Sequence, residues 1–282
     1  MREKALFNAE FGKLGINDFR RLSAFIYDTF GIFLPEKKLY LLQNRLVPRL
    51  RELGFTSYGP YVDYVLKQGM QSDEIFEMMN VVSTNKTEFF REKAHFDFLQ
   101  EKLLPGFYGQ YIQVWSAGCS SGEEVYSLAM LLAEEKETGH INDFFLFGND
   151  ISKKILAKAT KAVYPFGEVA SIPPKYRKKY LLRSKDKKNP TIRIVPELRA
   201  RTKFIWENLV GETDTLPNGF QFVFCRNTLI YFDRETQARV VARLVKHLMP
   251  GGYLILGHSE SLLYQMPQNL EIIKPTVYKK TK

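Results

Sequence analysis

One segment near the middle of the chain limits the possible folds more than any other. Residues 114–129 read VWSAGCSSGEEVYSLA, which is a hydrophobic strand, a loop of small residues and a helix that begins with two acids. A loop of glycine, alanine and serine lets a ligand approach the backbone closely. Placed between a strand and a helix, such a loop forms the mouth of a nucleotide-type site in an α/β sheet. The segment therefore predicts an α/β fold with a ligand-binding loop around Gly118.

The two acids, Glu123 and Glu124, narrow the choice of ligand. A pyrophosphate group favours the bare, partly positive N-terminus of a helix, and two carboxylates there would repel it. They suit a ligand that carries hydroxyls and positive charge, and S-adenosylmethionine has a ribose, an ammonium and a sulfonium. The other interpretation is that both acids only stabilise the helix dipole. This segment alone leaves both interpretations open.

The composition is typical of a globular cytoplasmic protein. Of the 282 residues, 45% are hydrophobic, yet no apolar run approaches the length of a membrane span and no signal peptide opens the chain. The two cysteines, Cys119 and Cys225, stand in apolar contexts, and the four histidines show no metal-binding spacing. We therefore expect a reducing, cytoplasmic setting, both cysteines in the core, no membrane insertion and no bound metal.

The net charge of +10 comes from one segment. Residues 161–203 hold thirteen Lys and Arg against three acids, and the rest of the chain is neutral overall. Such a segment attracts nucleic acid, an anionic membrane or an acidic protein surface, and charge alone leaves the three open.

Residues 17–79 have helical periodicity and predict a small all-helical domain over residues 1–80. Its second helix runs from Pro35 to Gly54 and carries a stripe of leucines. Pro48 should kink or split this helix. Three basic residues share one flank beside the leucines: Lys38, Arg45 and Arg49.

From about residue 110, strands alternate with helices, which predicts a doubly wound sheet in a domain over residues 81–282. The expected strands are 111–117, 144–148, 220–225, 253–256 and 272–278, with the last two as an antiparallel pair. The expected helices are 124–138, 153–162 and one that begins at Asp233 and ends at Pro250–Gly252. The basic segment, about 165–203, contains a strand-like stretch at 191–195 and reads as a small inserted β lobe.

Polar residues follow three of the predicted strands, where the ligand of such a sheet lies. Asp150 ends the second strand and could accept both ribose hydroxyls, or cap the next helix. Asn208 beside Leu209 suits the polar edge and the face of an adenine, or an ordinary turn. After the strand 220–225, three side chains should point into the cleft: Arg226, Asn227 and Tyr231.

Four blocks together resemble the CheR-type chemotaxis receptor methyltransferases. They are Asn85-x-Thr87-x-Phe89-Phe90-Arg91 with His95-Phe96, WSAGCSSGEE at 115–124, FCRNTLIYFD at 224–233, and Pro250-Gly251-Gly252 with Gly257-His258-Ser259-Glu260. The blocks occur in family order, and residues 44–51 resemble the basic helix of that family's N-terminal domain. The resemblance covers nearly the whole chain.

The resemblance implies a Rossmann-like methyltransferase that uses S-adenosylmethionine, esterifies receptor glutamates and releases S-adenosylhomocysteine. Positions that match cofactor contacts are Asn85, Thr87, Arg91, Glu124, Asp150, Asn208, Leu209, Arg226 and Asn227, and Gly118 lies in the loop beside them. Arg91 and Tyr231 match positions beside the transferred methyl group. We expect the flank of Lys38, Arg45 and Arg49 to bind the cytoplasmic helical bundle of a chemoreceptor. One departure is Asn149, where the family usually has Thr or Ser.

The acceptor chemistry requires no general base. A free glutamate has a pKa of about 4.3, so it is already a nucleophile at neutral pH. Catalysis then consists of alignment and removal of water, and we expect Arg91 and Tyr231 to orient rather than to activate.

Two other functions compete with this one. A nucleic-acid methyltransferase would need a pocket for a flipped base, and no Asn-Pro-Pro-Tyr-type block follows the fourth strand. The basic lobe also lacks the interleaved aromatic residues that bind single strands, so we expect no nucleic-acid partner. A non-catalytic cofactor-binding module is the third possibility, and the intact Arg91 and Tyr231 speak against it.

The inserted lobe carries a further expectation. Part of the family binds a short peptide at the receptor's C-terminus as an added edge strand, and those members share a glycine-bearing loop. Here residues 183–190 contain no glycine, and Pro190 removes a backbone donor beside the candidate edge strand 191–195. We therefore expect an enzyme that does not need the receptor's tail pentapeptide.

Overall fold

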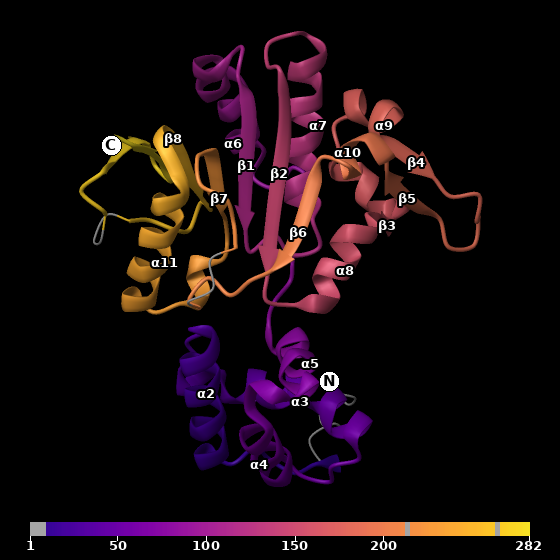
Figure 1. The fold of residues 1–282 in the computed structure, drawn as a ribbon. Helices are drawn as coiled ribbons and strands as arrows, with labels where there is room; N and C mark the ends of the chain where they lie inside the picture. Colours follow the sequence, from indigo (N-terminus) through magenta and orange to yellow (C-terminus); the bar gives the residue numbers. More distant parts are fainter. Residues whose placement is uncertain (1–9, 212–214, 263–265) are drawn as a thin grey trace. The chain divides into compact units, whose positions relative to one another are not determined.

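The computed structural model describes residues 10–211, 215–262 and 266–282, and it divides into two compact units (Figure 1). The helical unit comprises the described residues up to Thr84 together with Tyr231–Asp233. The sheet unit comprises Asn85–Ile230 and Arg234–Lys282. Each unit is described by itself.

The helical unit is built from amphipathic helices that bury their apolar stripes against one another. α3 buries Leu42, Leu46 and Leu50 and ends at Gly54, whose φ of 72° suits glycine. The helix is continuous through Pro48, so the expected split does not occur. The elements are α2 (Ile16–Phe30), η1 (Glu36–Lys38), α3 (Leu39–Leu53), α4 (Tyr58–Gln68), η2 (Gly69–Gln71) and α5 (Asp73–Val82).

The sheet unit is built on a seven-stranded sheet with the order β6-β2-β1-β7-β8-β10-β9 (Figure 1). The strands β6, β2, β1, β7 and β8 run parallel to one another. β10 is antiparallel to β8, and β9 is antiparallel to β10. The bounds are β1 (Tyr111–Ala117), β2 (Asp143–Asp150), β6 (Thr202–Trp206), β7 (Phe220–Cys225), β8 (Leu248–Leu256), β9 (Leu270–Lys274) and β10 (Val277–Lys280).

The strand order reverses between β1 and β7. The chain runs outward from β1 through β2 to β6 and then returns to place β7 on the other side of β1. All six residues of β7 are buried, as expected of a central parallel strand. Ligands of doubly wound sheets bind beyond the carboxyl ends of the strands at such a reversal. The loops after β1 and β7 therefore frame the candidate site.

Helices flank this sheet. α7 (Glu123–Glu137) contacts β2, α8 (Lys153–Lys161) contacts β2 and β6, and α11 (Arg234–His247) contacts β8. Ahead of β1 the chain forms α6 (Lys93–Phe98), a π-helical turn (Leu99–Leu103) and η4 (Leu104–Phe107). Both cysteines are buried, as predicted, Cys119 in the loop after β1 and Cys225 at the end of β7. Within the described ranges, no helix is both long and apolar enough to cross a membrane.

Two predicted boundaries near the C-terminus are wrong. β8 already begins at Leu248, so Pro250–Gly252 lies within the strand, where the pairing with β7 shifts register. The stretch 272–278 is not one strand. It contains the end of β9, a turn at Thr276, whose φ is 67°, and the start of β10. The antiparallel partner of β8 is β10.

The inserted lobe has its own three-stranded sheet with the order β3-β5-β4. β5 is therefore the central strand, and the expectation that residues 191–195 form an edge is wrong. The edges are β3 and β4, which pair with opposite sides of β5. The lobe consists of β3 (Val163–Pro165), η5 (Phe166–Ser171), α9 (Pro174–Tyr180), β4 (Leu181–Arg183), β5 (Thr191–Ile194) and α10 (Pro196–Arg199).

Candidate active site

The small-residue loop after β1 is tightly packed. The backbone N–H groups of Gly118 and Cys119 both donate to the carbonyl oxygen of Asn149, at 3.0 and 2.9 Å. Gly118 has a φ of 74°, and a Cβ there would overlap the side chain of Thr228 in the turn after β7. Only glycine fits this position, because both the backbone conformation and the space exclude a side chain.

Asp150, at the end of β2, ties the ends of β1 and β2 together. One carboxylate oxygen accepts the N–H of Ser120 at 3.0 Å, and the other accepts the N–H of Ser152 at 2.9 Å. Burial raises the pKa of Asp150, and these backbone donors oppose the rise. The N–H of Ile151 bonds the same carboxylate. A carboxylate offers about four acceptor sites, so about one remains for a ligand. Asp150 therefore holds the start of the next helical segment and retains capacity for a hydroxyl group.

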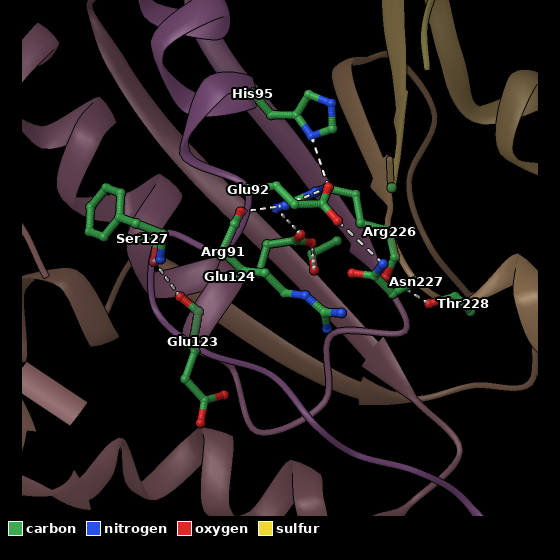
Figure 2. Close-up of polar contacts among 12 residues, drawn as sticks. Arg91, Glu92, His95, Glu123, Glu124, Ser127, Arg226, Asn227 and Thr228 are labelled. Atoms are coloured by element: carbon green, nitrogen blue, oxygen red, sulfur yellow. Dashed lines mark hydrogen bonds and ion pairs between the residues drawn. The ribbon is translucent and has the colours of Figure 1, made fainter. Parts of the chain in front are cut away.

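The two acids at the start of α7 have different environments (Figure 2). Glu123 is buried and accepts hydrogen bonds from the Ser121 hydroxyl at 2.8 and 2.7 Å. Burial raises its pKa. Glu124 accepts the Ser116 hydroxyl at 2.7 Å and the Nη1 of Arg226 at 2.9 Å. Glu123 thus bonds the loop just before α7, whereas Glu124 links β1 to the turn after β7.

Arg226 is the buried cation of this site. Its side chain is only 2% exposed and lies between Glu124 and Glu92, whose nearer oxygen is 3.1 Å from Nη2. The same nitrogen donates to the backbone oxygen of Arg91. Burial raises the pKa of Glu92, but the charge and hydrogen bond of Arg226 outweigh it, and the net pKa is lowered. Two carboxylates share one guanidinium, so the cluster carries surplus negative charge.

Two histidines adjoin this cluster. Ligand atoms of Glu92, His95 and His258 lie within 4.8 Å of one another, a spacing that could hold a metal ion. However, Arg226 already supplies positive charge at 3.1 Å from the Glu92 oxygen nearest both rings. Burial, aided by Arg226, lowers the pKa of His95 to about 4, so the ring is neutral near pH 7.

The segment before α6 lies against the same loop. The carbonyl oxygen of Asn85 accepts the Ser120 hydroxyl at 3.1 Å, and Thr87 is half-buried. Arg91 donates from Nη1 to the carbonyl oxygen of Lys86 at 2.9 Å. Phe89 and Phe90 are buried in the core beneath. The structure therefore brings Asn85, Gly118, Glu124, Asp150 and Arg226 to one end of the sheet.

Asn208 and Leu209 follow β6, at the same end of the sheet. Asn208 Oδ1 accepts the N–H of Val210 at 3.2 Å, and its backbone oxygen accepts Nη1 of Arg243 at 2.9 Å. Leu209 is buried. Asn227 has a left-handed φ of 59°, and its Nδ2 lies 3.4 Å from Glu92 Oε1.

Tyr231, by contrast, is grouped with the helical unit. Its hydroxyl donates to the carbonyl oxygen of Thr84 at 3.2 Å, and its own carbonyl accepts the N–H of Phe33 at 2.8 Å. Arg91 belongs to the sheet unit, so a meeting of Arg91 and Tyr231 at the methyl group stays a prediction.

The predicted basic flank of α3 needs one correction. Arg49 is only 6% exposed, and its Nε donates to Glu74 Oε1 at 3.0 Å in the interior of the helical unit. It is therefore a structural residue. Lys38 and Arg45 are half-buried, and Arg45 donates to the Val82 carbonyl and the Thr84 hydroxyl. Burial and the neighbouring Arg45 lower the pKa of Lys38.

Sequence reasoning missed two residues of the site. Asn149 accepts the indole N–H of Trp115 at 2.8 Å and donates to the Glu207 carbonyl at 2.9 Å, which links the ends of β1, β2 and β6. Its departure from the family's usual Thr or Ser was the signal. Glu260 accepts backbone N–H groups from the turn after β7. Its place in the Gly257-His258-Ser259-Glu260 block that resembles the family was a weaker signal.

Comparison with known proteins decides the family. Residues 85–279 match the family model described as CheR methyltransferase, SAM binding domain, and residues 17–83 match CheR methyltransferase, all-alpha domain. The chain belongs to the CheR methyltransferase family. The chemotaxis protein methyltransferase of Escherichia coli strain K12 is 37% identical over 268 residues, covering 94% of this chain and 92% of the relative. That of Borreliella burgdorferi is 35% identical over 272 residues and covers 94% of both chains.

Membership of the CheR family confirms several predictions. The fold is an all-helical domain followed by a Rossmann-like sheet, the cofactor is S-adenosylmethionine, and the enzyme class is a methyltransferase of chemotaxis. The helix-dipole interpretation of Glu123 and Glu124 stays a prediction, and the carboxylate of Glu123 accepts hydrogen bonds from the Ser121 hydroxyl.

Proposed function

We propose that this methyltransferase esterifies glutamate side chains of chemoreceptors at the crevice where β1 and β7 end. One observation carries the proposal: a buried Arg226 is shared by Glu92 and Glu124 beside the small-residue loop. The surplus negative charge favours a cationic ligand, because a buried carboxylate attracts a nearby positive charge strongly. We assign the cytoplasm as its location and assign no nucleic-acid partner.

The donor set fits the cofactor. Asp150 retains about one acceptor site for a ribose hydroxyl, and Glu124 offers negative charge to the ammonium or the sulfonium. We assign Asn208 to the polar edge of the adenine and Leu209 to its face. Asn85, Thr87, Gly118 and Asn227 complete the proposed cofactor contacts. When bound, S-adenosylmethionine supplies a methyl group on a positively charged sulfur.

The residues of the chain orient the acceptor and exclude water. The receptor glutamate is ionised at neutral pH, since its pKa is about 4.3, and it needs no base. Its negative charge disappears as it meets the sulfonium, so a strong clamp on the carboxylate would slow the reaction. We assign Arg91 and Tyr231 to alignment, which alone can lower the barrier substantially.

The receptor contact is proposed for the helical domain, residues 1–80, while residues 81–282 form the catalytic domain. Lys38, at the end of η1, and Arg45, on α3, supply positive charge that complements an acidic helical bundle. Arg49 is left out because it is buried against Glu74. The lobe, about residues 165–203, adds a diffuse positive field that favours encounter with such a bundle.

Alkali distinguishes the proposed product from its alternatives. Purified enzyme, receptor and radiolabelled S-adenosylmethionine should yield label on the receptor that is released as methanol at high pH. Methyl esters are base-labile, whereas methylated amines and nucleic-acid bases are not. Label that survives alkali would contradict the glutamate assignment, and absence of any transfer to receptor would contradict the function.

The tail pentapeptide of the receptor is not required in this proposal. The β4 edge of the lobe is only three residues long, and the loop 183–190 lacks glycine. In that loop the Asp186 carboxylate already accepts the N–H groups of Lys188 and Asn189, at 2.8 and 3.2 Å. These donors are thus occupied rather than open to a peptide strand.

Titration of the full chain with the pentapeptide tests this point. We expect no saturable binding in the micromolar range, and equal methylation of receptors with and without the tail. Specific binding, or loss of methylation when the tail is cut, would contradict it.

A further inference from the structure

Glu260 is a buried carboxylate that the chemistry above does not use. It is 4% exposed and lies in the segment that follows β8. Its Oε2 accepts the N–H of Gly257 at 2.7 Å and of Asn227 at 2.8 Å, and its Oε1 accepts the N–H of Ile230 at 3.3 Å. One side chain after β8 therefore holds both ends of the turn that follows β7.

The charge of Glu260 is balanced by the backbone. Within the described part of the chain, no lysine, arginine or histidine pairs with this carboxylate, and its partners are main-chain N–H groups. A buried carboxylate is costly unless it is fully hydrogen-bonded. Several amides converging on one carboxylate form a rigid junction, because each bond to a charged acceptor is stronger than a neutral one.

The turn that this junction holds has little freedom of its own. Asn227 adopts a left-handed φ of 59°, which is uncommon outside glycine. Across the junction, a Cβ on Gly257 would lie 2.8 Å from both Asn227 Nδ2 and Glu260 Oε2. The turns after β7 and β8 are thus fitted to each other at van der Waals contact.

We propose that Glu260 is a positioning residue for the cofactor site, which it serves by fixing the backbone of Asn227. That backbone directs the Asn227 side chain towards Glu92 and follows directly on Arg226, which lies between Glu92 and Glu124. Loss of the carboxylate lets the turn relax, so the side chains of Arg226 and Asn227 move out of position relative to the start of α7. This inference rests on the proposed function of the crevice.

Calorimetric binding of S-adenosylhomocysteine tests it, since this measurement needs no receptor. In Glu260→Gln the amide nitrogen cannot accept an N–H, so one oxygen's bonds are lost. We expect affinity to fall about tenfold, as removal of a hydrogen bond to a charged group typically does. The matched control is Glu135→Gln, another buried glutamate of the sheet unit, on the last turns of α7. Its melting temperature should fall, and its affinity should not.

Unchanged affinity in folded Glu260→Gln would overturn the proposal, as would an equal loss in Glu135→Gln. If Glu260→Gln does not fold, amide hydrogen exchange on the unaltered enzyme decides instead. The N–H groups of Asn227 and Ile230 should be protected without cofactor, and exchange at the rate of an open loop would overturn the proposal. Failure of the proposed function looks different: the unaltered enzyme would then bind S-adenosylhomocysteine without esterifying receptor.

Discussion

Nη1 of Arg226, in the turn after β7, donates to Oε2 of Glu124, in the first turn of α7, at 2.9 Å (Figure 2). This bond spans the reversal of strand order and joins the two halves of the doubly wound sheet. Arg226 thereby fixes the orientation of Glu124, while the Ser116 hydroxyl occupies the other carboxylate oxygen. Glu124 is therefore preset before any ligand arrives.

Glu124→Gln should weaken binding of S-adenosylhomocysteine about tenfold, because a charge-assisted hydrogen bond contributes about 1.5–3 kcal/mol. The neighbouring Glu123→Gln is the control, since its carboxylate bonds Ser121 and lies 4.0 Å from Lys158 Nζ, away from Arg226. Calorimetry should find a lower affinity for S-adenosylhomocysteine in Glu124→Gln. In Glu123→Gln it should find an unchanged affinity and a lower melting temperature. If the two variants bound S-adenosylhomocysteine with equal affinity, Glu124 would not belong to the cofactor site.

Asp150→Ala should lower cofactor affinity about ten- to a hundredfold, since ribose hydroxyls lose a charged acceptor. Ser152→Ala is the comparison. It removes the hydroxyl that caps α8 at Ile155 and should cost about 1 kcal/mol of stability without changing affinity. A folded Asp150→Ala protein with unaltered affinity would refute the assignment.

Tyr231→Phe should lower the turnover number more than it weakens binding of S-adenosylhomocysteine. The hydroxyl is assigned to alignment of the acceptor, although it also donates to the Thr84 carbonyl. Tyr27→Phe removes another tyrosine hydroxyl of the helical unit, which donates to Asp233 at 2.8 Å. Single-turnover kinetics should separate the two. Similar rates in both variants would mean that Tyr231 is structural.

Charge reversal of Lys38 and Arg45 to glutamate should raise the apparent KM for receptor severalfold, because exposed ion pairs contribute up to about 1 kcal/mol each. The effect should shrink at high salt, since the screening length is already about 8 Å at physiological ionic strength. Lys67→Glu, near the end of α4, applies a charge change elsewhere on the same unit. A receptor KM indifferent to the double reversal would make α3 purely structural.

His95 makes folding stability depend on pH. Its pKa is lowered from 6.5 to about 4 by burial and Arg226, so the unfolded chain binds more protons between these values. Stability is full above pH 6.5 and falls as pH drops towards 4. Between pH 7 and 5 the unaltered protein should lose about 2 kcal/mol more than His95→Gln does.

Chemical denaturation at both pH values measures this difference. His140→Gln, which removes a half-exposed histidine paired with Glu135, is the comparison and should keep the steep pH dependence. A parallel loss in His95→Gln and the unaltered protein would exclude His95 as the cause.

The sequence predicted the central part of the sheet closely, because hydrophobic runs bounded by small or polar residues are local signals. β1 and β7 have the predicted bounds, 111–117 and 220–225. Pairing is not a local signal. The stretch 191–195 reads as a strand, but only the structure shows that β3 and β4 both pair with it. The turn at Thr276 was missed because no glycine marks it.

Site residues were harder to interpret than site location. Arg49 and Arg45 lie on the same predicted flank, yet Arg49 is buried in an ion pair with Glu74. Glu74 lies on α5, far from Arg49 in the sequence. Helical spacing cannot reveal such a partner. Likewise Glu260 bonds a turn that lies 30 to 33 residues earlier, and its partners there are backbone N–H groups, which no side-chain pattern reveals.

The pairing of β1 with β7 also determines when the site can form during synthesis of the chain. Gln221 accepts the N–H of Gln113 across 108 residues, and the long lobe is made in between. A nascent chain that ends in the lobe contains β1 and the small-residue loop, but β7 and the turn with Arg226 have not yet been made. Contacts between such distant segments form late. Cofactor can therefore stabilise the completed fold by binding to it, and we expect little stabilisation of the chain before β7 is made.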